Sequence, residues 1–506
     1  MRPEELGTYY ESILDKEVRK ESGIYYTPPP IVDDMVESSL GEILKDKTSE
    51  ESTTIKIVDP ACGGGVFLLG AYQFLLDWYE KHFGKLTLKQ RRKVLTDNIF
   101  GVDIDPLAVE ITKYCLSMKC SEGKDNFLDL SKNIRCGNSL VETEFCWSKE
   151  FSKVFKRGGF DIVIGNPPYN VIETKNPLLD YYRKNFRCTA GGKVNLYKLF
   201  FEKGLSLIKD KGLLVYITPY NYLTSADSIK LREILLNETT IIEIVDYEES
   251  QKVFESATQA VATIVTRKQL SADYRFQYKK LGETYTLKSK EINCAPRLMF
   301  KGSNQVIKRM NLWKKTFDYF IEGYQGEINV STKKNFFVDK NQKGDLPLIR
   351  GNQIGYYETV AKPVEFCPVS ISTRSHHSIR RIAFQAIANV GSVRRIKGVI
   401  IENMLCGHSV NYMFSKHEEI PLEALLGVLN SRLVNYYFKF YNQTNNVPIG
   451  EIKMIPVLDC LFTSGGRLAK LVTRRLNGEL LDETIDAFVY ELYGLSNEEI
   501  AIIEGR

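Results

Sequence analysis

The segment Asp59-Pro-Ala-Cys-Gly-Gly-Gly-Val-Phe-Leu decides the fold of the first half of the chain. It ends the apolar run Ile55–Asp59 and opens the helical pattern Val66–Glu80, so it predicts a strand, a tight turn and a helix in succession. Glycines lack a Cβ, which lets the backbone turn sharply and approach a ligand closely. The turn matches neither Gly-x-Gly-x-x-Gly nor Gly-Lys-[Ser/Thr], which disfavours a dinucleotide or a nucleoside triphosphate as its ligand.

Outward from this turn, residues 1–270 alternate short β-rich runs with longer helical patterns, which predicts a mostly parallel sheet flanked by helices. The predicted helices are Val66–Glu80, Pro106–Cys120, Leu196–Lys209 and Ser228–Leu236. The predicted strands are Ile55–Asp59, Ile99–Asp103, Asn133–Cys136, Asp161–Gly165, Gly212–Thr218, Ile241–Asp246 and Ala260–Thr266. The last two strands are too close in sequence for a helical crossover, so we expect an antiparallel pair at one edge. The predicted fold is therefore α/β, with a Rossmann-like sheet of seven strands that ends in an antiparallel hairpin.

The second half of the chain has a different character. Between residues 271 and 420, short segments rich in Asn, Gln, Lys, Arg and Tyr are separated by Gly and Pro. Helical patterns return at Leu422–Leu433 and Leu480–Leu492. We therefore expect an α/β domain over residues 1–270, a mixed α+β domain over 271–420, and a helical part over 421–506 that braces the second domain.

The excess positive charge lies in this second half. Residues 271–450 contain 26 Lys and Arg against 14 Asp and Glu, whereas residues 1–270 contain 36 against 39. One interpretation is an ordinary solvated basic surface. The functional interpretation is a surface for a polyanion, because attraction to phosphates is the main sequence-independent term in nucleic-acid binding.

Composition excludes several classes of protein. With 43% hydrophobic and 26% charged residues, the chain of 506 residues is typical of globular proteins. It has no apolar run long enough to span a bilayer, and its first residues lack the pattern of a signal peptide, so we expect a cytoplasmic protein without a membrane partner. Its ten cysteines include no Cys-x-x-Cys pair, and we expect no metal site.

Polar residues follow two of the predicted strands and are candidates for ligand binding. Asp103 ends the second strand, where its carboxylate can accept hydrogen bonds from two ribose hydroxyls or, alternatively, begin the next helix. Asn138 follows the third strand, where its amide can read an adenine edge, although such residues more often form turns. Near the start of the chain, Thr27 and Pro28 suit the N-cap and the first residue of a helix, whose N-terminus favours a carboxylate ligand.

The most specific pattern is Asp161-Ile-Val-Ile-Gly-Asn-Pro-Pro-Tyr, in which an Asn-Pro-Pro-Tyr turn follows an apolar strand. An exocyclic amine conjugated to a ring is a poor nucleophile, because its lone pair is delocalised. The Asn166 side-chain oxygen and the Pro167 carbonyl can each accept one N–H of such an amine, which frees the lone pair for attack on a methyl sulfonium. Pro167 and Pro168 preorganise these acceptors, and Tyr169 can stack on the planar substrate.

Seven motifs occur in order along residues 20–270: Tyr-Thr-Pro-Pro, Asp-Pro-Ala-Cys-Gly-Gly-Gly, Gly-Val-Asp-Ile-Asp-Pro, Gly-Asn-Ser-Leu, Asn-Pro-Pro-Tyr, Asn195-Leu-Tyr-Lys-Leu-Phe and Val253-Phe-Glu-Ser. Together they resemble the amino-methylating DNA methyltransferases of the γ class, and look most like the TaqI methyltransferase group. The resemblance is fainter in the second half, where Leu346-Pro-Leu-Ile-Arg-Gly-Asn-Gln-Ile and Leu429-Asn-Ser-Arg-Leu look like that group's target-recognition domain.

The resemblance implies S-adenosylmethionine as cofactor and the N6 amine of adenine in double-stranded DNA as the methylated group. Asn166, Pro167, Pro168 and Tyr169 would hold an adenine flipped out of the duplex, and Phe254 would stack on its other face. Phe254 can also be a core residue of the edge hairpin. Nine residues would line the cofactor site: Thr27, Asp59, Ala61, Gly63, Asp103, Ile104, Asn138, Ser139 and Phe200. Relatives often carry other polar or acidic residues at the positions of Asp59 and Asn138.

This resemblance implies a site-specific modification enzyme of a restriction-modification system. Residues 271–420 would then be the target-recognition domain, facing the catalytic domain across a cleft that fits duplex DNA. A separate cognate restriction endonuclease is a candidate partner. A fused nuclease domain is not expected, because only about 20 residues precede the first motif.

Other functions are also compatible with some of these motifs. Asn-Pro-Pro-Tyr also serves enzymes that methylate a glutamine amide in translation release factors, although those are much shorter, and an RNA adenine methyltransferase is a second enzymatic alternative. A non-catalytic DNA-specificity module is the alternative from another class, but an unused site has no reason to retain both the cofactor loop and the Asn-Pro-Pro-Tyr turn. A cytosine-C5 enzyme needs a Pro-Cys nucleophile, and the chain contains no such dipeptide.

Overall fold

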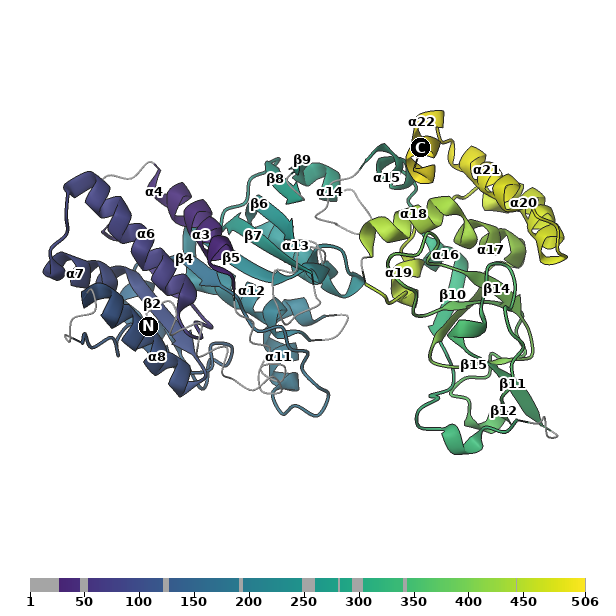
Figure 1. The fold of residues 1–506 in the computed structure, drawn as a ribbon, viewed down its shortest axis with the longest axis horizontal. Coiled ribbons are helices and arrows are strands. Elements are labelled where there is room, and N and C mark those ends of the chain that lie inside the picture. The colour runs from purple at the N-terminus through teal and green to yellow at the C-terminus, as the bar shows by residue number, and fades with distance from the viewer. Residues whose placement is uncertain are drawn as a thin grey trace. The chain divides into compact units, whose positions relative to one another are not determined.

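The computed structural model describes residues 27–45, 53–121, 127–190, 194–247, 260–280, 283–293, 304–339, 344–442 and 444–505. The chain divides into two compact units, Met1–Gly302 and Ser303–Arg506 (Figure 1).

The first unit is built on a mostly parallel sheet. Within the described residues this sheet has nine strands, in the order β3-β2-β1-β4-β5-β7-β6-β8-β9. Neighbouring strands from β3 to β5 run parallel, whereas β7 runs antiparallel to both β5 and β6. The strands are β1 (Ile57–Asp59), β2 (Ile99–Asp103), β3 (Ile134–Cys136), β4 (Phe160–Gly165), β5 (Ile208–Pro219), β6 (Thr240–Tyr247), β7 (Val261–Arg267), β8 (Arg275–Lys280) and β9 (Glu283–Lys288).

All seven predicted strands are present, and β6 and β7 form the expected antiparallel pair, which confirms a mixed α/β fold. The prediction that this pair forms one edge of the sheet is wrong. Strand β8 pairs with β6, and β9 pairs with β8, so the sheet continues beyond seven strands. In β8, the buried Phe276 and Tyr278 alternate with polar residues, and the Tyr278 hydroxyl donates to the Asp246 carboxylate in β6. The first unit therefore extends past residue 270, where we expected it to end.

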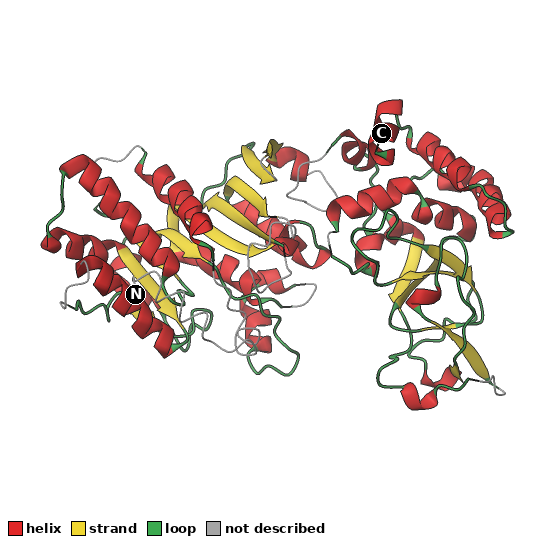
Figure 2. Ribbon diagram, viewed as in Figure 1, coloured by secondary structure: helices red, strands yellow, loops and turns green. Residues whose placement is uncertain are grey.

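Helices connect the parallel strands and pack against the sheet (Figure 2). Helices α6 and α7 contact β2, α8 contacts β2 and β3, α12 contacts β4 and β5, and α13 contacts β6. The helices are α3 (Pro29–Val36), α4 (Glu42–Leu44), α6 (Val66–Phe83), α7 (Leu88–Asn98), α8 (Pro106–Ser121), α9 (Trp147–Glu150), α10 (Ser152–Phe155), α11 (Leu179–Asn185), α12 (Leu196–Leu207), α13 (Ile229–Glu238) and α14 (Ser289–Asn293), with a π-turn at Glu37–Gly41. Sequence analysis missed α7, although Thr87 and Gln90 form a capping box at its start.

The second unit combines two small sheets with helices. Its described strands form a four-stranded antiparallel sheet, β10-β16-β13-β14, and a three-stranded sheet, β12-β11-β15. Helix α17 packs on β13, β14 and β16, and α20 packs on α17. The strands are β10 (Ile321–Gln325), β11 (Asp345–Ile349), β12 (Phe366–Pro368), β13 (Arg381–Gln385), β14 (Gly398–Ile401), β15 (Leu405–Cys406) and β16 (Val410–Ser415). The helices are α15 (Gln305–Met310), α16 (Phe317–Phe320), α17 (Leu422–Asn430), α18 (Arg432–Tyr441), α19 (Ile449–Lys453), α20 (Leu461–Leu476), α21 (Asp482–Tyr493) and α22 (Asn497–Glu504).

The predicted helix Leu422–Leu433 is two helices, α17 and α18, separated at Ser431. The Ser431 hydroxyl accepts a hydrogen bond from the Val434 N–H (3.1 Å), so this residue caps the second helix. Helix α21 corresponds to the predicted helix Leu480–Leu492. Among the helices that the structure describes, none combines the length and apolar character needed to cross a membrane.

Candidate active site

The glycine-rich turn after β1 is held in one conformation by its neighbours. Gly63 and Gly65 have φ angles of 49° and 83°, in the left-handed region that side chains with a Cβ rarely adopt. The Cys62 N–H donates to the Val102 carbonyl in β2 (3.0 Å), and the Thr112 hydroxyl in α8 donates to the Gly63 carbonyl (2.7 Å). A Cβ at Gly65 would lie 2.8 Å from the Thr112 side chain, so this close approach requires glycine.

Asp103 stands at the carboxyl end of β2, next to this turn. Its carboxylate accepts hydrogen bonds from the N–H groups of Gly63 (2.8 Å) and Asp105 (2.9 Å). Desolvation raises the pKa of the Asp103 carboxyl, while these backbone hydrogen bonds act to lower it. The following Ile104 side chain is 68% exposed, which leaves an apolar surface beside a carboxylate that has capacity for further hydrogen bonds.

Asp59 links the turn to the strand that precedes Asn-Pro-Pro-Tyr. Its buried carboxylate accepts a hydrogen bond from the Ala61 N–H (3.0 Å). A Cβ at Gly165, the last residue of β4, would lie 2.5 Å from this carboxylate, so the glycine leaves the space that Asp59 fills. The Asp59 carboxylate therefore lies between the carboxyl ends of β1 and β4.

Asn138 and Ser139, which follow β3, both make contacts within the protein. The Asn138 amide accepts from the Leu140 N–H (3.2 Å) and donates to Glu144 (3.0 Å), which is the geometry of the turn residue considered above. The buried Ser139 hydroxyl donates to the Pro60 carbonyl (2.5 Å) and so fastens this turn to the loop after β1. Contacts of Asn138 and Ser139 with a cofactor stay predictions.

The structure brings Asn166 and Thr27 together. The Asn166 amide nitrogen donates to the hydroxyl of the buried Thr27 (3.1 Å), across 139 positions in sequence. We predicted that Thr27 caps the helix and that Pro28 is its first residue, but α3 begins at Pro29 with Pro28 as its cap. Because the Thr27 hydroxyl contacts Asn166 instead, its position bears directly on the orientation of the Asn166 amide.

The rest of the Asn-Pro-Pro-Tyr turn packs into the unit. Pro167 is buried, Pro168 is half-buried, and Tyr169 is buried with its ring edge-on to that of Tyr197 in α12 (6.5 Å between centroids, 79° between planes). After the turn, the Leu196 N–H at the start of α12 donates to the Asn170 carbonyl (2.9 Å). These contacts fix the turn against α12.

Helix α12 carries the Asn195-Leu-Tyr-Lys-Leu-Phe motif, including Phe200, which is buried. Sequence analysis missed the partner of Lys198 in this motif. Its buried ammonium donates to the Asp227 carbonyl (2.9 Å) and pairs with the Asp227 carboxylate (3.0 Å), while desolvation lowers the pKa of Lys198. Phe254 lies outside the described residues.

Several of the predicted site residues lie together at the carboxyl ends of neighbouring strands. Strands β2, β1 and β4 are adjacent and parallel. Asp103 and Asp59 are the last residues of β2 and β1, and Asn166 directly follows β4. In open α/β sheets the carboxyl ends of the strands are where ligands bind. The arrangement places the exposed apolar side chain of Ile104, the Asp103 carboxylate and the Asn166 side-chain amide at the ends of neighbouring strands.

Comparisons with known proteins show which sequences and folds this chain is similar to. Residues 97–254 match the family described as Eco57I restriction-modification methylase. The Type II restriction enzyme and methyltransferase RM.Eco57I of Escherichia coli is 28% identical over 363 residues, which cover 60% of this chain and 36% of that protein. The adenine-specific methyltransferase PglX of Streptomyces coelicolor is 26% identical over 231 residues, which cover 39% of this chain and 19% of that protein. The chain thus spans about a third or less of the length of these two relatives.

A similar fold occurs in the Type IIL restriction-modification enzyme MmeI, whose structure was solved in complex with DNA. The TM-score is 0.63 at 13% identity, and the match covers 99% of this chain and 80% of that one. At this identity the match concerns the fold alone. Residues 97–254, which contain Asp103, Asn138 and Asn166, are similar to the Eco57I restriction-modification methylases.

Proposed function

We propose that this protein is a site-specific DNA methyltransferase that transfers a methyl group from S-adenosylmethionine to the N6 amine of adenine, as the modification activity of a restriction-modification system. The observation that carries the proposal is the Asn166-Pro167-Pro168-Tyr169 turn at the carboxyl end of β4, beside the loops that contain Gly63 and Asp103. The matched family and RM.Eco57I are named as restriction-modification methyltransferases, which supports this class of enzyme. PglX is named an adenine-specific methyltransferase, which supports adenine as the methylated base.

The residues present fit S-adenosylmethionine. The Asp103 carboxylate is of the type that accepts hydrogen bonds from ribose hydroxyls, and the exposed Ile104 offers an apolar face for a flat ring. The left-handed glycines let the turn after β1 approach a ligand closely. When bound, S-adenosylmethionine supplies an activated methyl group on a sulfonium.

The protein's part in the chemistry would be to prepare the amine. The Asn166 side-chain oxygen and the Pro167 carbonyl accept its two N–H groups, which favours tetrahedral geometry and localises the nitrogen lone pair. Pro167 and Pro168 hold these acceptors without reorganisation, since their φ angles are fixed by the ring. No charged base is required before transfer, because the methylated amine loses its proton afterwards.

The target adenine would be flipped out of double-stranded DNA, as enzymes that act on bases generally require. We assign sequence recognition to the second unit, which contains most of residues 271–450 and their excess of Lys and Arg. A separate cognate endonuclease stays a predicted partner.

The proposed function is tested by methylation-sensitive sequencing of DNA from cells that express the protein. We expect N6-methyladenine at one recurrent sequence, absent when Asn166 is replaced. Methylation of RNA adenine or of a protein glutamine instead would contradict the proposal, and so would the absence of any methylated product.

Replacing Asp103 with alanine should weaken S-adenosylmethionine binding by about tenfold to a hundredfold, because the ribose hydroxyls lose a charged acceptor. Isothermal titration calorimetry measures the dissociation constant. The Asp97→Ala variant is the matched control, since it removes an exposed carboxylate from α7 of the same unit. Equal affinities for Asp103→Ala and wild type would refute the assignment.

Replacing Thr27 with valine, which has a similar shape but no hydroxyl, should lower the rate of methyl transfer at saturating cofactor by about tenfold, because the Asn166 amide loses a hydrogen-bond acceptor. The Thr27→Ser variant keeps the hydroxyl and should retain most of the rate. Single-turnover kinetics and cofactor titration separate two roles. A raised cofactor dissociation constant at an unchanged saturated rate would make Thr27 a cofactor contact, not a positioning residue.

A further inference from the structure

Two loops of the second unit lie side by side and are joined by an antiparallel bridge between Ile387 and Asn446. The first, residues 387–393, follows β13, and the second, residues 444–446, follows α18. The Ala388 N–H donates to the Asn445 carbonyl (2.8 Å), and the Val390 N–H donates to the Asn445 side-chain oxygen (2.9 Å). We call residues 387–393 and 444–446 the finger.

The second loop of the finger is held by a fully buried arginine. The Arg395 guanidinium donates to the Asn442 carbonyl (2.6 Å), the Asn446 carbonyl (3.2 Å) and the Thr444 carbonyl, and it lies over the Phe438 ring (4.9 Å). These acceptors are uncharged oxygens, and desolvation lowers the pKa of Arg395 to about 10. Burying a cation among neutral partners is costly, and here the cation is hydrogen-bonded to the carbonyls of Asn442, Thr444 and Asn446, which holds the loop to the core of the unit.

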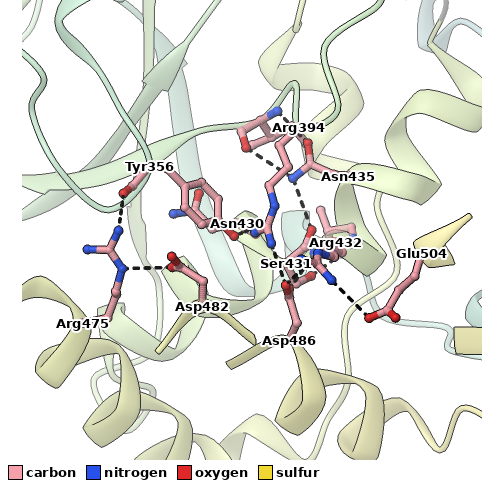
Figure 3. Close-up of polar contacts among 12 residues, drawn as sticks. Tyr356, Arg394, Asn430, Ser431, Arg432, Asn435, Arg475, Asp482, Asp486 and Glu504 are labelled. Carbon is pink, nitrogen blue, oxygen red and sulfur yellow. Dashed lines mark hydrogen bonds and ion pairs between the residues drawn. The ribbon is translucent and has the colours of Figure 1, made fainter. Parts of the chain in front are cut away.

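The adjacent Arg394 anchors the first loop to the C-terminal helices. Its guanidinium donates to the Asp486 carboxylate in α21 (2.7 Å) and to the Asn430 carbonyl (3.1 Å), and it lies over the Tyr356 ring (4.3 Å). Figure 3 shows Arg394 and Arg432 converging on Asp486. Each loop of the finger is therefore held by an arginine that donates several hydrogen bonds and lies over an aromatic ring.

The tip of the finger has an unusual composition for an exposed loop. Ile387 and Val393 are 61% and 84% exposed, and Asn389 between them is also exposed. Residues 387–393 contain no Lys or Arg, and residues 382–401 and 424–450 contain no Asp or Glu. The loops of the finger themselves therefore present no carboxylate that would repel a polyanion. The tip itself lacks the cations that phosphates attract, whereas apolar and amide side chains are those that contact thymine methyl groups and base edges.

We propose that the finger contacts base edges of duplex DNA and contributes to the choice of target sequence. The inference rests on the proposed function, since it names the surface of the second unit that reads the methylated site. Preorganisation by Arg394 and Arg395 fits this role, because base discrimination depends on side chains held in register with the groove.

The first test is Val393→Glu, measured as the affinity of the full chain for a duplex that contains the methylated site. Because Val393 is 84% exposed, the substitution leaves the core of the unit intact. Repulsion between the new carboxylate and DNA should weaken binding by about tenfold at low salt, and the difference should narrow as salt screens it. The matched control is Leu480→Glu, which introduces the same charge at a side chain that is 89% exposed in the same unit and outside the finger.

The second test is the double variant Ile387→Ala, Val393→Ala. If the tip contacts bases, the ratio of affinities for the target duplex and a scrambled duplex should fall about tenfold, with the affinity for the scrambled duplex unchanged. A parallel loss on both duplexes would mean a sequence-independent surface, and a loss of self-association without a change in DNA binding would mean a second copy as the partner. Either result overturns the proposal.

Methylation of DNA by the wild-type chain distinguishes failure of the finger assignment from failure of the proposed function. If the wild-type chain methylates DNA at a defined site while Val393→Glu and the double variant behave like wild type, the finger assignment fails and the proposed function stands. If the wild-type chain methylates no DNA, the proposed function itself fails.

Discussion

Asn166→Ala is expected to lower the rate of methyl transfer by about a hundredfold to a thousandfold while leaving S-adenosylmethionine affinity near that of wild type. The asparagine oxygen is assigned to the target amine, and removal of one preorganised hydrogen-bonding group from a reaction centre commonly costs this much. Single-turnover transfer of labelled methyl groups to target DNA measures the rate, and calorimetry measures cofactor affinity.

Two further variants sharpen this prediction. Asn166→Asp keeps an acceptor oxygen but loses the amide nitrogen that donates to Thr27, so we expect an activity between those of Asn166→Ala and wild type. Asn185→Ala is the matched control, because it removes an exposed asparagine from α11 of the same unit. Transfer by Asn166→Ala at the wild-type rate would remove this residue from the chemistry.

Local patterns predicted the strands and the turns of the first unit. A glycine-rich turn between an apolar strand and a helix restricts the backbone locally, and the structure has left-handed glycines there. Helical patterns between the strands predict that neighbouring strands run parallel. Parallel strands place Asp59, Asp103 and Asn166 at the same end of the sheet, where the carboxyl ends of the strands lie. The alternation of apolar and polar residues in Arg275–Lys280 is typical of a strand, but the change in composition near residue 270 favours a domain boundary there, so the two signals conflict at β8 and β9.

Contacts between distant segments could not be predicted in this way. The hydrogen bond between Thr27 and Asn166 depends on how α3 packs, which no local pattern encodes. The same holds for Asp59, whose carboxylate fills the space left by Gly165. Such contacts form only when separate elements dock, so they are known once the tertiary structure is known.

The net charge of residues 271–450 is a poor predictor of a surface that binds DNA. Several arginines of the basic segment 271–450 have internal partners: Arg350 pairs with Glu365, Arg381 with Glu327, and Arg394 with Asp486. These residues hold the second unit together, whereas lysines such as Lys334 and Lys362 are exposed to solvent. A count of charges therefore overstates the number of cations that can meet phosphates.

The buried ion pair between Glu327 and Arg381 leads us to expect a large loss of stability when one of its members is replaced. Both side chains are fully buried, and the guanidinium donates to the carboxylate at 2.7 and 3.0 Å and to the Met404 carbonyl at 2.7 Å. The carboxylate also accepts from the Cys406 N–H (3.1 Å), so the pair ties β13 to β15. Loss of one partner from such a pair leaves an uncompensated charge in the interior.

Glu327→Gln should therefore destabilise the second unit by about 3–5 kcal/mol, although it keeps the volume of the side chain. The chain has two compact units, so global unfolding need not be two-state, and hydrogen exchange in β13 and β16 is the more direct measurement. The matched control is Glu479→Gln, which removes the partner of Arg474 from an exposed pair and should leave exchange unchanged.

A double variant tests the physical reason. Replacing both members by apolar side chains, Glu327→Leu with Arg381→Met, removes the buried charge together with its partner. It should therefore be less destabilising than Glu327→Gln alone, because the desolvation cost disappears with the ion pair. Slow exchange in β13 and β16 of Glu327→Gln, equal to that of wild type, would show that the pair contributes little. If the double variant were instead less stable than the single one, the hydrogen bonds to Met404 and Cys406 would be the interactions that hold the two strands together.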